Sequence, residues 1–288
     1  MLHLFQFPRR ASVHSLVLMA GAALLATASH AQVNQVAIFR SGVNSQTGPS
    51  SSSSDFYFMS DRAFEGNPSA IGSASLSYPP SQTGTLTVNG SEFDYSPATQ
   101  PTLTDLNSAF PTGNYVTSWQ GGTAGSGSST IAYTGDIYPN IPLFSASTYG
   151  SLITPSGVDT SSGLTFDWNS FTPNGAANEN DIFFSILDLS TNADVYSNSF
   201  QPSTTTSNFV PASDFTPGQS YQATIDFSSR INDFGISPGT VQGFDQLTEA
   251  DFQTPAATPE PTPVATFGVA IIGLTCLLMR ARRKMTSK

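Results

Sequence analysis

Between residues 32 and 260 the chain contains no histidine, no cysteine and no lysine. Without these residue types the segment cannot build a Ser-His-Asp or Cys-His nucleophile, and it cannot form a lysine Schiff base. Zinc and copper sites of the usual nitrogen and sulfur type are excluded as well, and so is a disulfide. The only cysteine, Cys276, lies in an apolar run near the end of the chain, where we interpret it as a small packing residue.

Positive charge is nearly absent from the same segment. Three arginines stand against 20 carboxylates, which gives residues 32–260 a formal net charge of −17. Nucleic acid is excluded as a partner because its binding requires basic patches. Anionic polysaccharide would be repelled as well, unless divalent cations bridged the two. The three arginines are Arg40, Arg62 and Arg230.

The first 31 residues are typical of a secretory signal peptide. Arg9 and Arg10 form a positive region, and residues 16–26 form an apolar run that is too short to span a bilayer well. Small residues then lead to Ala31, which is followed by Gln32. We therefore predict cleavage between these two residues and export of the remainder, with an uncleaved N-terminal anchor as the alternative.

A second signal lies near the end of the chain. A proline-rich stalk at residues 255–263 contains the tripeptide Pro259-Glu260-Pro261. Residues 264–279 then form an apolar run, close to the lower length limit of about 17 residues for a membrane-spanning helix. Basic residues in segment 280–288 would hold that end in the cytoplasm by the positive-inside rule. They are Arg280, Arg282, Arg283 and Lys284.

The order of tripeptide, short hydrophobic helix and arginine cluster resembles the PEP-CTERM sorting tail. This resemblance covers only about residues 258–284, and Pro263 and Thr266 depart from the usual pattern. It implies an inner-membrane intermediate that an exosortase, a membrane transpeptidase-like protease, recognises and cuts. It further implies delivery to the cell surface or extracellular matrix of a Gram-negative bacterium that makes exopolysaccharide. The alternative is an ordinary C-terminal anchor on a proline-rich stalk.

Between the two signals the sequence pattern is that of β-strands. Short apolar or alternating runs are separated by turn residues, and no long stretch has a helical period. Asn89-Gly90 between two such runs predicts a β-hairpin. Serine and glycine predict loops at residues 45–54 and 121–129. We therefore predict an all-β fold, built as a sandwich. The expected strands include residues 36–39, 86–88, 91–95, 164–168, 182–187 and 221–227.

Residues 156–254 show the pattern of a β-sandwich module more clearly than residues 32–155 do. A Pro-Gly turn precedes Tyr221 at the start of an alternating strand. This arrangement resembles the tyrosine corner of fibronectin type III and other immunoglobulin-like sandwiches, in which the hydroxyl bonds to upstream backbone. A plain turn with a packed tyrosine is the alternative, and Trp168 is an expected core residue. Residues 32–155 form either a separate β module or one half of a single larger jelly roll.

Two candidate ligand sites stand out. Asn178, Glu179 and Asp181 collect oxygen-bearing side chains before a strand, as a calcium site requires, and a solvated turn is the alternative. No other cofactor is expected. Trp119, Tyr138 and Tyr149, if exposed, could be platforms for a carbohydrate beside one of the many aspartates. Many of these aspartates are next to a phenylalanine in the sequence. A half-buried strand, in which Phe points inward and Asp points outward, produces such neighbouring pairs without any ligand.

These observations favour a structural or adhesive protein of the cell surface or exopolysaccharide matrix, and not an enzyme. A carbohydrate-binding module is the first alternative. A glycoside hydrolase is the other, because that reaction needs only two carboxylates, but no pair among the 20 lies in a recognisable motif.

Overall fold

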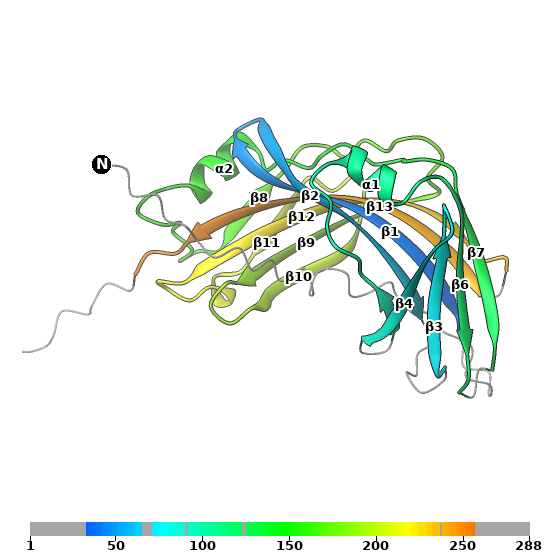
Figure 1. Cartoon of the computed structure of the whole chain (residues 1–288). Coiled ribbons are helices and arrows are strands. Elements are labelled where there is room, and N and C mark those ends of the chain that lie inside the picture. Colours follow the sequence, from blue (N-terminus) through cyan, green and yellow to red (C-terminus); the bar gives the residue numbers. More distant parts are fainter. Residues whose placement is uncertain (1–32, 65–70, 90–91, 123–124, 237, 257–288) are drawn as a thin grey trace, which may run out of the picture.

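The computed structural model describes residues 33–64, 71–89, 92–122, 125–236 and 238–256 (Figure 1). The signal peptide with Ala31 and Gln32 lies outside these residues. So does the sorting tail, with Pro259-Glu260-Pro261, the apolar run 264–279 and the cluster Arg280, Arg282 and Arg283. Both signals therefore stay predictions. In the part of the chain that is described, no helix has the length and apolar character to cross a membrane.

The described chain is all-β, as predicted, and one sheet dominates it. Eleven strands pair in the order β10-β9-β12-β13-β1-β2-β5-β4-β3-β6-β7, and a second sheet pairs β11 with β8. Two short helices, α1 (Leu103–Ala109) and α2 (Ala146–Leu152), begin at hydroxyl N-caps. The strands are β1 (Gln35–Gly48), β2 (Ser51–Phe64), β3 (Ser73–Tyr78), β4 (Gln82–Asn89), β5 (Glu92–Tyr95), β6 (Gly113–Gln120), β7 (Gly127–Tyr133), β8 (Leu164–Asp167), β9 (Glu179–Asp188), β10 (Ala193–Pro202), β11 (Ser207–Val210), β12 (Ser220–Asp233) and β13 (Gly239–Gln253).

The two halves of the chain share the large sheet. β1 pairs in parallel with β13 from Gln35 opposite Gly239 to Ser45 opposite Glu249, and it pairs antiparallel with β2 on its other side. A strand of the first half thus lies between β2 and a strand of the second half. The division expected near residue 155 does not separate two sheets.

Local predictions succeeded where alternation was clear. Each expected strand overlaps an observed one, although β5 begins at Glu92 and β8 ends at Asp167, and β4 pairs with β5 through Asn89 opposite Glu92, as the hairpin prediction requires. Gly90 lies outside the described residues. The loop predicted at 45–54 is wrong, because β1 runs to Gly48 and β2 begins at Ser51. Ladder pairing holds this serine-rich hairpin extended, and Gln46 anchors it through two hydrogen bonds to the backbone of Phe144, of 2.8 and 3.0 Å.

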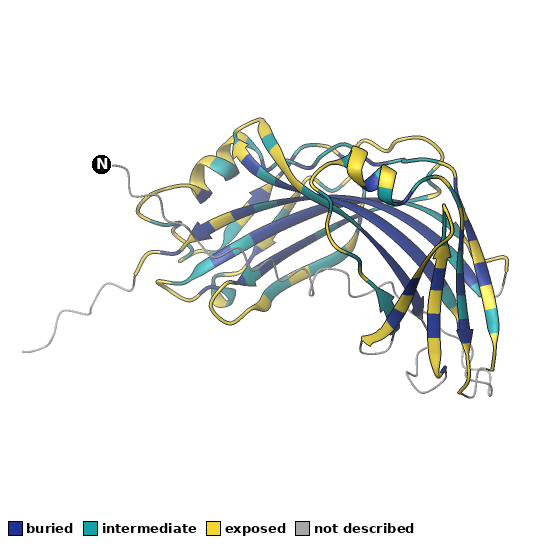
Figure 2. Ribbon diagram, viewed as in Figure 1, coloured by how far each residue is buried: buried dark blue, intermediate teal, exposed yellow. Residues whose placement is uncertain are grey.

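Two hydrophobic cores lie on one face of the large sheet. The first packs α1 and the strands from β3 to β7 against β1 and β2. The second packs α2, β8 and β11 against β9, β12 and β13, and the rings of Phe166 and Phe184 meet there at 5.0 Å between centroids. Figure 2 shows β1, β12 and β13 buried along their middle. Core 1 includes Val36, Ile38, Met59, Leu76, Leu86, Leu106, Tyr115, Trp119 and Ile131. Core 2 includes Phe144, Phe166, Trp168, Ile182, Phe184, Val210, Tyr221, Phe227 and Phe252.

A strap, residues 134–145, leads from β7 to α2 and joins the two cores. Tyr138 of the strap belongs to core 1 and Phe144 belongs to core 2. Its backbone is held by buried polar side chains of the sheet, since Thr248 Oγ1 donates to the carbonyl of Pro142 at 2.6 Å and Gln46 bonds to Phe144. These contacts satisfy backbone groups that would otherwise be costly to bury.

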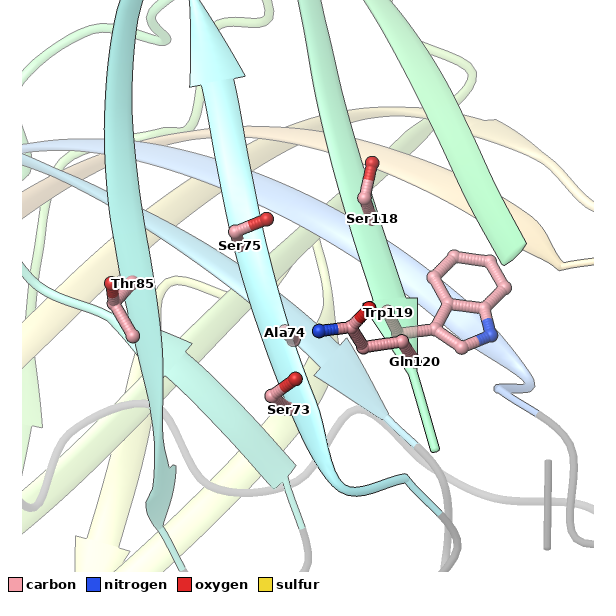
Figure 3. Close-up of a pocket in the computed structure, with 7 residues that line it drawn as sticks. All are labelled: Ser73, Ala74, Ser75, Thr85, Ser118, Trp119 and Gln120. Atoms are coloured by element: carbon pink, nitrogen blue, oxygen red, sulfur yellow. The ribbon is translucent and has the colours of Figure 1, made fainter. Parts of the chain in front are cut away.

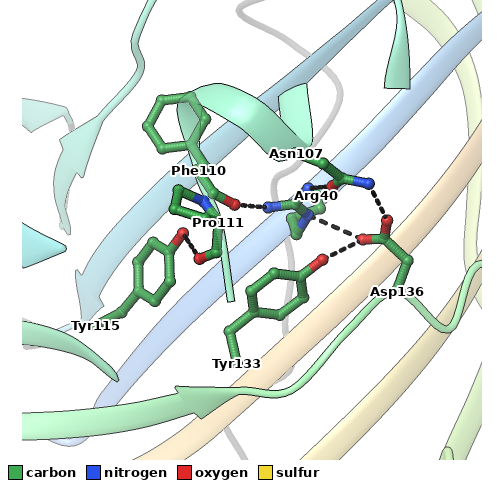
Figure 4. Close-up of polar contacts among 7 residues, drawn as sticks. All are labelled: Arg40, Asn107, Phe110, Pro111, Tyr115, Tyr133 and Asp136. Atoms are coloured by element: carbon green, nitrogen blue, oxygen red, sulfur yellow. Dashed lines mark hydrogen bonds and ion pairs between the residues drawn. The ribbon is translucent and has the colours of Figure 1, made fainter. Parts of the chain in front are cut away.

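Arg40 fixes the other end of the strap (Figure 4). Its side chain is 1% exposed, and Nε lies 3.1 Å from Oδ1 of Asp136. Nη1 donates to the carbonyl of Phe110 at 2.9 Å, at the end of α1, and Nη2 donates to Asn107. The guanidinium also lies 4.4 Å from the ring centre of Tyr133, on β7. One buried cation therefore connects β1, α1, β7 and the strap.

Replacing Asp136 with alanine tests this network. Arg40 would be left buried without its carboxylate, so we expect the free energy of unfolding to fall by about 3–5 kcal/mol. The matched control is Asp159→Ala, an exposed carboxylate that accepts a hydrogen bond from nearby Ser161, for which we expect a much smaller loss. Urea denaturation followed by circular dichroism measures both. Equal losses in the two variants would contradict the role given to Arg40.

Candidate functional site

The predicted calcium ligands are engaged with β12. Asn178 accepts from the backbone N–H of Asn232 at 2.9 Å and donates to its carbonyl at 2.8 Å. Glu179 accepts from the Asn232 side chain, and Asp181 lies 3.2 Å from Nη1 of Arg230. Among the described residues, no group of three or more His, Cys, Asp or Glu side chains could hold a metal ion. The pairing of β9 with β12 directs the three predicted side chains to protein partners.

Of the three proposed aromatic platforms, Trp119 and Tyr138 are buried and Tyr149 is half-buried. Trp119 is 9% exposed and Tyr138 is 8% exposed, both in core 1, and Tyr149 packs against core 2. The indole of Trp119 covers Gly127, where a Cβ would lie only 2.6 Å from the ring. Alternation along β6 turned Trp119 inward, so its neighbours Ser118 and Gln120 point outward instead.

Tyr221 and Trp168 lie in core 2. The Tyr221 hydroxyl accepts a 2.7 Å hydrogen bond from the backbone N–H of Thr216, five residues upstream. Trp168 stacks on Phe184 at 5.5 Å between ring centres, and its Nε1 donates to the carbonyl of Thr205 at 3.0 Å. Both side chains are buried and partnered, so their role in the described structure is to position the strands.

Buried carboxylates form a second group of candidates. Asp226 and Asp245 lie on the face of the large sheet opposite the cores, and burial raises the pKa of both. The Asp245 carboxylate accepts from Ser41 and Ser228, at 3.1 and 2.6 Å. Both side chains are buried, with 8% and 3% exposure, and the hydrolase alternative gains no support from this pair. On the core side, the buried Asp61 accepts from Thr117.

The outward face of β3, β4, β6 and β7 carries a different chemistry. Ser75 stands opposite Thr85 on one side and Ser118 on the other, and Ser118 is in turn opposite Ser128. Figure 2 shows exposed and buried positions alternating along β3 and β4, so every second residue faces solvent. We call these side chains the hydroxyl face. They are Ser73, Ser75, Ser77, Thr83, Thr85, Thr87, Asn114, Ser118, Gln120, Ser128 and Thr130.

A hollow of about 310 Å³ lies on the hydroxyl face. Figure 3 shows its polar lining, with Ser73 and Ser75 on β3, Thr85 on the neighbouring β4, and Ser118 on β6. The indole of Trp119 points away from these side chains in the same view. The lining is therefore mixed, with the polar side chains of Ser73, Ser75, Thr85, Ser118 and Gln120 beside Ala74 and the buried Trp119.

The hydroxyl face has no charge and few internal partners. Among the described residues, Thr87 is its only member whose side chain makes a hydrogen bond within the protein, donating to the carbonyl of Asp94. The arginines lie elsewhere: Arg40 pairs with Asp136, Arg62 with Glu92 at 3.3 Å, and Arg230 with Asp181. Sequence reasoning missed this face, although the alternation of Ser or Thr with apolar residues in 73–78 and 83–88 was the signal.

No protein-family model and no curated protein sequence matches this chain. Function therefore has to be argued from the terminal signals and from the chemistry of the described residues.

The buried carboxyls predict a fold that is more stable in mild acid. Burial raises the pKa of Asp61 from 3.8 to about 7, and burial likewise raises that of Glu249 to about 7. Between about pH 4 and pH 7 such a carboxyl is ionised in the unfolded chain but still protonated in the folded state, so a rise in pH favours unfolding over this range. We expect the free energy of unfolding to fall as the pH rises from about 4 through about 7, with Asp61 contributing about 4 kcal/mol at most.

Urea denaturation at a series of pH values measures this slope. Asp61→Asn should flatten it, because the amide keeps an acceptor for Thr117 and cannot ionise. Asp159→Asn removes the same charge from an exposed site and should leave the slope between pH 4 and 7 unchanged. An identical slope in the wild type and in Asp61→Asn would contradict the assignment.

Proposed function

We propose that this chain is an exported structural or adhesive protein of the cell surface or exopolysaccharide matrix of a Gram-negative bacterium, and that it is not an enzyme. The observation that carries the proposal is the surface of the described segment. All three arginines are paired inside the sheet, while an uncharged hydroxyl face is presented to solvent. Such a surface suits contact with polysaccharide rather than nucleic acid.

The signals at the two ends of the chain support export followed by sorting to the cell surface. The signal peptide directs export, and the apolar run 264–279 holds an inner-membrane intermediate with its basic end in the cytoplasm. The Pro-Glu-Pro tripeptide then resembles the recognition motif of an exosortase-type protease. The absence of His, Cys and Lys from residues 32–260 supports a role without nucleophilic catalysis.

The proposal includes a sandwich architecture for residues 156–254 and a second candidate function. The contact between Tyr221 and Thr216, together with the packing of β8 and β11 over β9 and β12, supports the resemblance of residues 156–254 to immunoglobulin-like sandwiches. The hollow on the hydroxyl face favours a second candidate function, a carbohydrate-binding module with a defined ligand.

The sorting route is tested in the native host. We expect mass spectrometry of the protein from the envelope and medium to find a C-terminus near residues 259–261, without residues 264–288. The triple substitution Pro259→Ala, Glu260→Ala and Pro261→Ala should keep the tail and accumulate in the inner membrane. Pro255→Ala, in the same stalk but outside the motif, should be processed normally. Wild-type protein that ends at Lys288 in the membrane fraction would contradict exosortase sorting.

A further inference from the structure

The hydroxyl face is a regular two-dimensional array. Side chains on one face of a strand repeat every two residues, about 6.6–6.8 Å apart, and neighbouring strands lie about 4.8 Å apart. Three such positions on β3, Ser73, Ser75 and Ser77, lie beside Thr83 and Thr85 on β4. The pairing with β6 and β7 extends the array across four strands. The surface is therefore broad, and its polar groups are closely spaced, with Val116 and Ala132 as apolar positions of the same face.

The array both donates and accepts hydrogen bonds. Each serine or threonine hydroxyl offers one donor and two acceptor lone pairs, and the amides of Asn114 and Gln120 offer both kinds of group. Almost all of these groups have no hydrogen-bond partner within the described protein. A complementary partner must therefore present closely spaced donors and acceptors over an extended area, as a chain of sugar units does. A lipid surface lacks them, and a peptide strand would pair with a sheet edge rather than a face.

The negative charge of the protein favours neutral polysaccharides over anionic ones. The hydroxyl face carries no ionised side chain, whereas residues 32–260 carry a net charge of −17 and no arginine free to attract an anion. At physiological salt the field of those carboxylates reaches about 8 Å, which would repel an anionic polymer and leave a neutral one unaffected.

We propose that the hydroxyl face binds an extended neutral polysaccharide, with one or two sugar units seated in the hollow between β4, β3 and β6. This deepens the proposed function and rests on it for where the protein meets the polymer. A single hydrogen bond exchanged with water contributes only about 0.5–1.5 kcal/mol, so many bonds along the chain are needed. The hollow lies over Ser75, Thr85 and Ser118, and these side chains are central to the contact.

Binding is tested with protein purified from the host after export. The probes are the neutral fraction of the host's exopolysaccharide, separated from its anionic fraction by ion exchange, and cellulose as a neutral polymer of known structure. We expect co-sedimentation with at least one neutral polymer, little change between low and high salt, and no binding to the anionic fraction in the absence of divalent cations.

Variants locate the contact. Ser75→Asp with Thr85→Asp places two charges beside the hollow and should weaken binding about tenfold or more, which corresponds to about 1.4 kcal/mol. The milder pair Ser75→Ala with Thr85→Ala removes hydroxyls without adding charge and should weaken binding less. The control is Ser197→Asp, an exposed serine on β10 at the opposite edge of the large sheet, which should bind as the wild type does.

Two outcomes would overturn the proposal. One is no binding to either neutral polymer by folded wild-type protein. The other is binding that is equal in the Ser75→Asp, Thr85→Asp variant and in Ser197→Asp. Either result leaves the sorting route untouched, because that route is read from the processed C-terminus. A failure of binding is thereby distinguished from a failure of export.

Discussion

The parallel pairing of β1 with β13 is the constraint on which the rest of the structure depends. It joins residues about 200 positions apart, from Gln35 opposite Gly239 onward. Such a contact has a high loop-closure cost and no local turn to fix its register. It is therefore stable only as part of the whole sheet. β13, which is 15 residues long, contributes Phe244 to core 1 and both Ala250 and Phe252 to core 2, so this strand connects the two cores.

Residues 32–260 have only three cations, and all three arginines form ion pairs with carboxylates. Arg40 is buried against Asp136 and the end of α1, where it ties the strap to β1. Arg62 pairs with Glu92, and Arg230 pairs with Asp181 at the junction of β9 and β12. These internal pairs stabilise the sheet and leave the surface of the described segment with carboxylates and hydroxyls. Such a surface repels polyanions and does not repel neutral molecules.

Local alternation made the strands predictable, because a half-buried strand must alternate whatever its neighbours are. The same rule places Ser75 outward and Leu76 inward. The hairpin at residues 45–54 could not be predicted, since its extension depends on Gln46 meeting Phe144, which is 98 positions away in the sequence. Trp119 and Tyr138 could not be placed either, because burial of an aromatic depends on which strand closes over it. Nor did any local signal indicate that Asn178 and Asp181 would meet Asn232 and Arg230, which are brought there by the β9–β12 pairing.

The most direct test of the central claim is whether the two cores unfold together. The chain has two tryptophans, Trp119 in core 1 and Trp168 in core 2, so each core carries its own fluorescent probe. In the variants Trp168→Phe and Trp119→Phe, the remaining indole reports one core during urea unfolding. A sheet shared through β1 and β13 predicts that, in each variant, fluorescence and circular dichroism give one coincident transition. A transition of Trp168 at a urea concentration where the rest of the protein stays folded would show two independent modules and contradict the account.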